Sequence, residues 1–211
     1  MQLRDTPNGY GWISIGLHWI TALAVFALLF AGSSIGGEVS SSALRLHTTI
    51  ALCLYAVFWW RIAWRVRQGH PTFEGPARPV SQRLASLVHY ALIGAMAVML
   101  ISGPPMAWSG DRPLMFFGWE IPSPIPVGHG AFGMLRAIHA WTAAFLGLGV
   151  TLHICGVLKH MVYDRDDVFD RIMVPAARTA EPARYNKCQD AVAGSSSGQA
   201  RGQEPGQGEI R

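Results

Sequence analysis

The sequence predicts an all-α integral membrane protein, a four-helix bundle with both termini in the cytoplasm. Half of the 211 residues are hydrophobic and only 14% are charged. Four apolar runs are each long enough to cross about 30 Å of hydrocarbon as a helix. The runs lack the alternation of barrel strands, and a backbone in lipid must satisfy its own hydrogen bonds, so helices are expected in all four.

The four predicted spans belong to one membrane domain that covers about residues 1–175. The first span, about residues 11–33, is longer than the core of a signal peptide and lacks a cleavage site of small residues, so we expect it to be retained. The second, third and fourth spans cover about residues 44–64, 84–108 and 132–163.

A run of Gly103, Pro104 and Pro105 lies near the end of the third span. Because proline removes a backbone donor and clashes with the preceding turn, we expect a kink or an early helix end there. The alternative is a gap beside a bound cofactor or quinone. The connection that follows, about residues 109–131, is rich in proline and glycine and is expected to form an ordered cap without regular secondary structure.

The last part of the chain, residues 176–211, contains mostly Gly, Ser, Gln and Pro and is expected to be a disordered polar tail on the cytoplasmic side. The three cysteines are scattered and no Cys-x-x-Cys-His occurs, which disfavours a disulfide framework and covalent haem attachment. The net charge of +4 comes from basic residues that flank apolar runs. It therefore indicates membrane topology and no nucleic-acid partner.

The orientation of the spans follows from the lysines and arginines, which stay on the cytoplasmic side. The basic residues at the second connection and after the fourth span are Arg61, Arg65, Arg67, Arg78, Arg83, Lys159, Arg165 and Arg171. The opposite side has only Arg45, Arg112 and Arg136. The first and third connections are therefore expected to face the periplasm.

Five histidines fall within the predicted spans, where ionisable groups are costly and usually functional. His139 and His153 are 14 residues apart in the fourth span. In a helix that spacing is about 21 Å along the axis, and the two directions differ by only about 40°. One face thus presents an imidazole near each membrane surface, which suits two stacked haems with axial nitrogen ligands.

Depth suggests a partner for each of these imidazoles. His18 lies at the cytoplasmic depth of His153, and His47 lies at the periplasmic depth of His139. We call His18 with His153 the inner pair and His47 with His139 the outer pair. His89 in the third span lies at the same depth as the inner pair, so depth alone leaves open which two of those three histidines bind iron.

Zinc is the competing ligand chemistry for these histidines. A structural zinc ion normally takes four close ligands and often cysteine. Here the histidines form pairs without carboxylates beside them in the spans, so two axial ligands on a planar macrocycle fit better. His160 follows His153 by two turns and is expected at the lipid headgroups. His70 and His129 fall in connections and are expected to be solvated or hydrogen-bonded.

Short motifs at these histidines resemble one known family. They are Gly-Tyr-Gly-Trp-Ile-Ser-Ile-Gly-Leu-His18-Trp, Leu-Arg-Leu-His47, Leu-Val-His89-Tyr, Ile-His139-Ala-Trp, Leu-His153-Ile-Cys-Gly-Val-Leu-Lys-His160 and Tyr163-Asp-Arg-Asp-Asp-Val-Phe-Asp-Arg-Ile-Met-Val-Pro175. In this order and spacing, about residues 8–175 resemble the bacterial cytochrome b561 family, di-haem proteins related to the cytochrome b subunits of nickel–iron hydrogenases. The long polar tail and the Gly-Pro-Pro run depart from that family.

The resemblance implies two b-type haems in a bacterial inner membrane. It implies His18, His47, His139 and His153 as the axial ligands. His89 and His160 also fall at family positions, and the resemblance implies that they hydrogen-bond a propionate or a quinone without binding iron.

The resemblance also implies a reaction, in which superoxide on the periplasmic side gives electrons and ubiquinone takes them. Arg45, Arg112 and Arg136 on that side are candidates to steer the anion. The alternative is that Arg45 and Arg136 pair with haem propionates. Besides lipid and quinone, a periplasmic redox protein is a candidate partner.

Two other functions remain open beside that reaction. One is an electron-transfer subunit that docks a periplasmic redox protein and has no substrate of its own. The other is a non-redox membrane protein such as a metal transporter, which the lack of carboxylates inside the spans disfavours.

Overall fold

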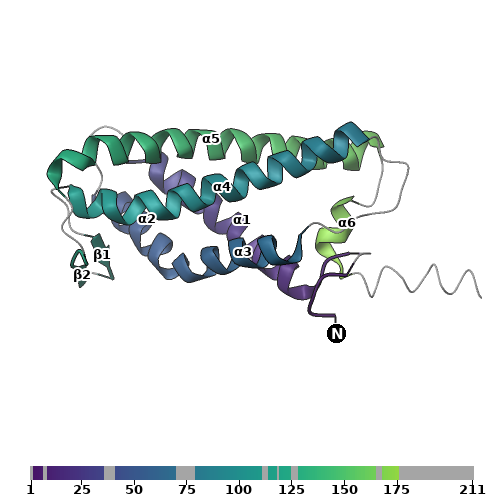
Figure 1. Ribbon diagram of the computed structural model, residues 1–211, viewed down its shortest axis with the longest axis horizontal. Helices are drawn as coiled ribbons and strands as arrows, with labels where there is room; N and C mark the ends of the chain where they lie inside the picture. Colours follow the sequence, from purple (N-terminus) through teal and green to yellow (C-terminus); the bar gives the residue numbers. More distant parts are fainter. Residues whose placement is uncertain are drawn as a thin grey trace, which may run out of the picture.

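A computed structural model describes residues 2–6, 9–35, 41–69, 79–110, 114–117, 119–124, 128–164 and 168–175. The fold is mainly helical (Figure 1). Its α-helices are α1 (Trp12–Ser33), α2 (Ser41–Cys53), α3 (Tyr55–Gln68), α4 (Pro79–Ser109), α5 (Phe132–Lys159) and α6 (Val168–Met173). Its shorter elements are β1 (Leu114–Phe116), β2 (Trp119–Ile121), the 3-10 turn η1 (His129–Ala131) and the π-helical turn η2 (His160–Asp164). The predicted tail, residues 176–211, lies outside the described residues.

Three helical segments are long and apolar enough to cross a membrane, namely Trp12–Ser33, Arg83–Ser109 and Phe132–Asp164. The segments Ser42–Cys53 and Tyr55–Gln68 add a fourth crossing if they form one span, which is bent by 48°. The predicted second span, about residues 44–64, is thus two helices. Leu54 separates them at φ −102° and ψ 3°. Neither proline nor glycine lies at this break, so the sequence contains no ordinary signal for it.

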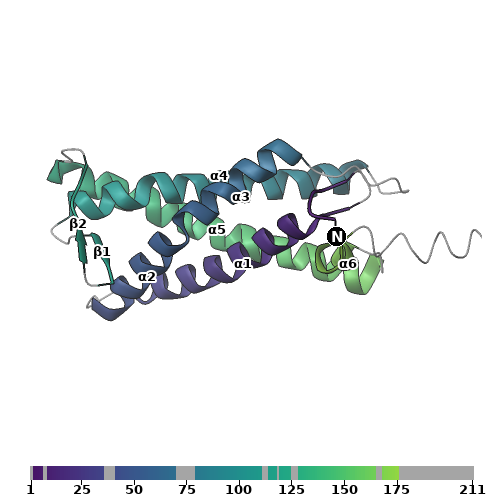
Figure 2. The same ribbon diagram turned by 90° about the horizontal axis from the view of Figure 1, so that it is seen from below.

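The long helices run side by side and pack against one another in a bundle. Figures 1 and 2 show α4 and α5 side by side along the long axis, and α1 packs against α2 and α3. The N-terminal segment and α6 lie at one end of the bundle, and β1 and β2 lie at the other. The beginning of the chain and the described residues that follow α5 are therefore at the same end.

The bundle is closed at mid-depth by an apolar cluster. Ala24, Phe58, Met96 and Leu100 are its buried members, from α1, α3 and α4. The outer surface is also apolar, since Leu23, Phe30 and Trp141 are 67%, 76% and 78% exposed. So much exposed apolar surface on long helices is what lipid contact requires.

Helix α4 continues through Pro104 and Pro105 to Ser109, so the early end that the sequence suggested does not occur. Proline at position 104 cannot donate to the carbonyl of Leu100, four residues earlier. The Tyr55 hydroxyl, on α3, donates to this Leu100 oxygen at 3.3 Å. A neighbouring helix thus supplies the hydrogen bond that the proline removes.

The connection between α4 and α5 contains a regular element that the sequence did not predict. Strands β1 and β2 form an antiparallel hairpin in which Leu114 pairs with Ile121 and Phe116 pairs with Trp119. The indole of Trp108 donates to the carbonyl of Ile121 at 3.0 Å and fastens the hairpin to the end of α4. The hairpin contacts α2 and α4, so it covers the end of the bundle where the outer pair lies.

Candidate functional site

The outer pair brings α2 and α5 together. The ring centroids of His47 and His139 are 6.4 Å apart, with an angle of 72° between the ring planes. His47 Nδ1 lies 3.1 Å from the carbonyl oxygen of Leu28 on α1. A carbonyl only accepts, so Nδ1 carries the proton and the lone pair of His47 is on Nε2.

The second imidazole of the outer pair is held by a hydroxyl. His139 Nδ1 lies 3.0 Å from Ser102 Oγ on α4. The Ser102 hydroxyl is also directed at the carbonyl of Met99, at 3.4 Å. Since that carbonyl can only accept, the hydroxyl donates to it and accepts from Nδ1. The lone pair of His139 is then also on Nε2, the nitrogen available for a metal.

Two glycines let the helices approach the rings of the outer pair. A Cβ atom at Gly32 on α1 would lie 3.5 Å from the His47 ring, and a Cβ atom at Gly103 on α4 would lie 3.5 Å from the His139 ring. These are ordinary contact distances, so each ring rests directly on a neighbouring helix backbone. The rings are therefore supported by hydrogen bonds at Nδ1 and by backbone contact.

The inner pair brings α1 and α5 together. The ring centroids of His18 and His153 are 6.2 Å apart, with 62° between the ring planes. The third candidate, His89 on α4, has its centroid only 4.9 Å from that of His153. Its Nδ1 lies 2.6 Å from the carbonyl of Ala85, one turn earlier in the same helix. The structure thus gathers all three histidines, but at two different separations.

The ring centroids in the two pairs are 6.2 and 6.4 Å apart, and this distance can be compared with that of two imidazoles bound to one metal. With a metal–nitrogen bond of about 2.0 Å, and about 1.1 Å from nitrogen to ring centre, two imidazoles on opposite sides of one metal would have centroids about 6.2 Å apart. Among the described residues, no group of three or more His, Cys, Asp or Glu side chains is arranged to hold a metal ion. The centroid distances in both pairs are close to the value that two imidazoles would have if they held one metal from opposite sides.

The two pairs lie at opposite depths of the bundle. His139 and His153 are 14 residues apart on the continuous helix α5, which is about 21 Å along its axis. Leu146, midway between them, is buried. Met96 on α4 and Ala24 on α1 belong to the apolar cluster at mid-depth. An apolar layer therefore separates the inner pair from the outer pair.

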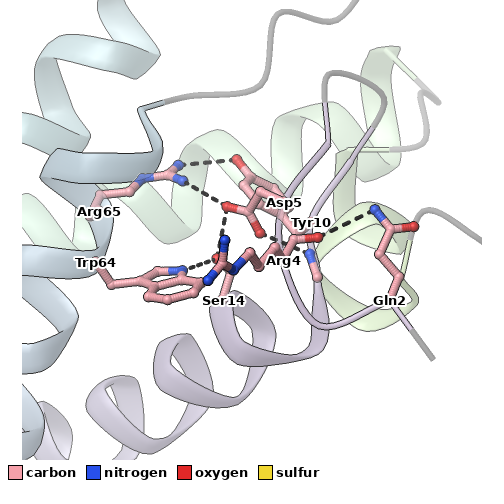
Figure 3. A network of polar contacts seen from close by, with 8 residues as sticks. Gln2, Arg4, Asp5, Tyr10, Ser14, Trp64 and Arg65 are labelled. Atoms are coloured by element: carbon pink, nitrogen blue, oxygen red, sulfur yellow. Dashed lines mark hydrogen bonds and ion pairs between the residues drawn. The ribbon is translucent and has the colours of Figure 1, made fainter.

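A polar network closes the end of the bundle beside the inner pair (Figure 3). The Asp5 carboxylate accepts from the backbone N–H of Gly11 and from the Ser14 hydroxyl, each at 2.8 Å. Ser14 in turn accepts from the indole N–H of Trp64 at 2.8 Å. Asp5 also pairs with Arg65 at 3.9 Å, and both side chains are only 5% exposed. The N-terminal segment is thereby bound to α1 and α3, one turn before His18.

Arg61 on α3 lies beside this network without joining it. Its side chain is partly buried, and it acts electrostatically on the imidazoles of His18 and His89. Arg65 donates to the Tyr10 hydroxyl at 3.2 Å and pairs with Asp5. Within the described part of the chain Arg61 makes no comparable hydrogen bond or ion pair. It is therefore a partly buried positive charge near the inner pair, and Asp5 acts on it without forming a direct ion pair with it.

The remaining predicted site residues are less central in the structure. Arg45 and Arg136 are exposed on α2 and α5, two and three residues before His47 and His139. His160 lies in η2 with Nδ1 3.1 Å from an Asp164 carboxylate oxygen, which also pairs with Lys159. Outside the described residues lie Arg112, His70 and the side chain of His129.

Sequence patterns did not identify three groups that act on the imidazoles: the Ser102 hydroxyl, the Leu28 carbonyl and the Arg61 guanidinium. Ser102 is one of many small polar residues in the chain, and a backbone carbonyl has no residue-specific signal. Arg61 contributed only to the predicted membrane topology. Each of these three groups acts on an imidazole because of how the helices pack, and no local sequence pattern encodes that packing.

Comparisons with known proteins agree with these features. A family profile described as prokaryotic cytochrome b561 matches residues 9–175. The chain is 27% identical over 179 residues to cytochrome b561 homolog 2 of Escherichia coli (strain K12), which covers 82% of this chain and 95% of that protein. It is 28% identical over 159 residues to a heme A synthase of Rhizorhabdus wittichii, which covers 70% of this chain and 46% of that protein.

Proposed function

The chain belongs to the prokaryotic cytochrome b561 family, and from this premise we propose that it holds two b-type haems between four histidines. As a member of this family, the chain is a multi-pass membrane protein that binds haem and transfers electrons. A haem iron changes its oxidation state by one electron while the protein ligands tune its potential. The residues of this chain hold the haems, separate them and keep water away.

The separation of the imidazoles is the observation that supports two haems most directly. His18 with His153, and His47 with His139, have centroid distances of 6.2 and 6.4 Å, close to what one shared iron requires. The centroids of His89 and His153 are 4.9 Å apart, too close for one iron between them. This difference favours His18 over His89 as the ligand opposite His153. Each pair also joins two different helices, as cofactor sites in bundles do.

We propose that superoxide is the electron donor on the periplasmic side and ubiquinone the acceptor. Two superoxide ions each lose one electron and become dioxygen, and one ubiquinone takes these two electrons and two protons to become ubiquinol. The exposed Arg45 and Arg136 are close in sequence to the outer ligands and give that end positive charge. Positive charge around a site raises the encounter rate of an anion.

The orientation is part of the same proposal. The end with α6 and the N-terminal segment is the cytoplasmic end, and the hairpin end is periplasmic (Figure 2). Arg65 and Arg67 at the end of α3 and Lys159 at the end of α5 favour this orientation through the positive-inside rule. The membrane is then the inner membrane of a bacterium.

A second candidate function has support from the hairpin. Phe117 and Trp119 are 71% and 78% exposed at the end that we propose to be periplasmic. Exposed aromatic side chains are typical anchors of protein–protein contacts. The protein could then receive electrons from a docked redox protein in place of superoxide.

Haem content of the purified protein tests the proposal first. We expect a b-type absorption spectrum and two haems per chain by pyridine haemochrome. His47→Ala or His139→Ala should remove one haem, and His18→Ala or His153→Ala should remove the other. A protein without haem, or with one haem per chain, contradicts the proposal.

The electron donor is tested on the haem-loaded protein. A pulse of superoxide should reduce the haems within the mixing time, and added ubiquinone should reoxidise them. Haems that stay oxidised after the pulse contradict the superoxide proposal and favour the docked partner. In that case Phe117→Ser with Trp119→Ser should weaken reduction by the partner.

A further inference from the structure

The two histidine pairs differ in how the protein holds them. Both imidazoles of the outer pair have a partner at Nδ1, the Leu28 carbonyl at 3.1 Å and the Ser102 hydroxyl at 3.0 Å. The rings of His18 and His153 have no comparable partner among the described residues. The contrast matters because the group at Nδ1 changes how strongly Nε2 donates electrons to a metal.

Hydrogen bonding at the outer pair favours oxidised iron. An imidazole that donates from Nδ1 is a more basic ligand at Nε2, and a more basic ligand stabilises the ferric state. His47 and His139 both have this arrangement, so the effect applies to both axial positions. The reduction potential of an outer haem is lowered accordingly.

Charge near the inner pair has the opposite effect. Arg61 and Arg65 lie one turn apart on α3, and Arg65 pairs with Asp5, which accepts a hydrogen bond from Ser14 one turn before His18. Reduction adds one negative charge to the iron, and a nearby positive charge in a medium of low dielectric stabilises that product. Arg45 and Arg136 at the outer end are exposed, so their charges are screened by water and salt.

Nearby charges of opposite sign do not remove this difference between the inner and the outer pair. Asp5 pairs with Arg65 and also acts on Arg61, so among these three side chains one carboxylate faces two guanidinium groups and a net positive charge remains at the inner end. At the outer end Glu120 on β2 is exposed, as are Arg45 and Arg136, and water and salt screen exposed charges strongly. His89, the third imidazole near the inner pair, bonds to the carbonyl of Ala85 in its own helix.

We propose that the haem between His18 and His153 has the higher reduction potential, and that Arg61 and Ser102 set the difference from opposite ends of the bundle. The inference rests on the proposed function, because it requires two haems. At equilibrium an electron then resides mainly at the cytoplasmic end. Arg61 and Ser102 are positioning residues here, since neither is a ligand of iron.

A potentiometric titration of the haem-loaded protein tests the inference. Arg61→Gln should lower the higher potential, and Ser102→Ala should raise the lower one. We expect each change to alter the electron distribution between the two haems about tenfold, which equals about 59 mV for a one-electron couple. Repeating Arg61→Gln in a His47→Ala protein, which keeps only the inner haem, identifies the haem that shifts.

Two variants separate charge from structure. Arg61→Lys keeps the charge and should retain the potential of the unmodified protein. Arg67→Gln removes an exposed arginine from the same helix and should shift neither potential. Unchanged potentials in both Arg61→Gln and Ser102→Ala, or equal effects of Arg61→Lys and Arg61→Gln, overturn the inference.

Haem content measured beforehand distinguishes the two possible failures. A chain that binds fewer than two haems refutes the proposed function, whereas two haems with unchanged potentials refute only the order of potentials. If Arg61→Gln does not accumulate, Ser102→Ala alone decides. A lower potential that does not rise in Ser102→Ala then overturns the inference.

Discussion

The hydroxyl of Ser102 on α4 accepts a hydrogen bond from Nδ1 of His139 on α5 at 3.0 Å. The same hydroxyl is directed at the carbonyl of Met99, so its own proton is already engaged. Ser102 is therefore oriented as an acceptor by its own helix, and it orients an imidazole on the neighbouring one. This contact determines which nitrogen of His139 is available to a metal.

Ser102→Ala should weaken haem binding at the outer pair. Partners of a ligating histidine typically contribute 10–100-fold to metal affinity, so we expect about a tenfold loss. Haem transfer to an excess of an apo-haem protein measures it as faster loss of one of the two haems. Ser109→Ala is the matched control, because within the described residues Ser109 on the same helix bonds only to the carbonyl of Met106. Equal haem loss in the two variants contradicts the prediction.

His89→Ala should retain both haems. Its ring is too close to His153 for a shared iron, and its Nδ1 bonds within α4. His18→Ala is the matched comparison and should reduce the haem content from two per chain to one. Haem-to-protein ratios by pyridine haemochrome check both variants. If His89→Ala loses a haem and His18→Ala does not, the inner ligands are His89 and His153.

Tyr55→Phe should destabilise the bundle by about 1 kcal/mol. The change leaves the Leu100 carbonyl without a donor, because Pro104 has no N–H to offer it. Unfolding in mixed detergent micelles measures the free energy. In a Pro104→Ala background the amide of residue 104 can donate to Leu100, so the same Tyr55→Phe change should cost less there. Equal costs in both backgrounds would falsify this account of how α4 tolerates the proline.

Asp5→Asn should destabilise the N-terminal end of the bundle by about 3 kcal/mol, since it leaves the buried Arg65 without its counter-charge. Thermal unfolding of the haem-loaded protein checks the direction, with the exposed Arg4→Gln as control. The double variant Asp5→Asn with Arg65→Gln should lose less than the sum of the single losses. Additive losses would mean that the two side chains act independently.

Replacing Arg45 and Arg136 by glutamine should slow reduction by superoxide several-fold at low ionic strength. The effect should disappear near 1 M salt, where charges are screened within about 3 Å. The rate of haem reduction across a salt series measures it, with Arg67→Gln at the opposite end of the bundle as control. An effect that persists in high salt, together with weaker haem binding, indicates that these arginines pair with propionates.

Much of the architecture could be predicted from local patterns. Apolar length located the three long helices, because a span needs about 20 residues of continuous hydrocarbon contact. The 14 residues between His139 and His153 predicted one imidazole at each depth, because α5 is a continuous helix with a fixed rise and turn. The break at Leu54 and the hairpin β1–β2 escaped prediction, since neither has a residue signal of its own.

The sequence by itself therefore determined the family, the three long helices and the two depths at which histidines occur. Only the tertiary structure decided which histidines lie close together and at what distance. The rotation of α1 against α5 separates His18 and His153 by 6.2 Å, and that of α4 brings His89 to 4.9 Å from His153. The same packing aims Ser102 at His139 and leaves Arg61 near His18. Periodicity fixes the position of a side chain on its own helix, but the relative rotation of two helices depends on all the side chains between them.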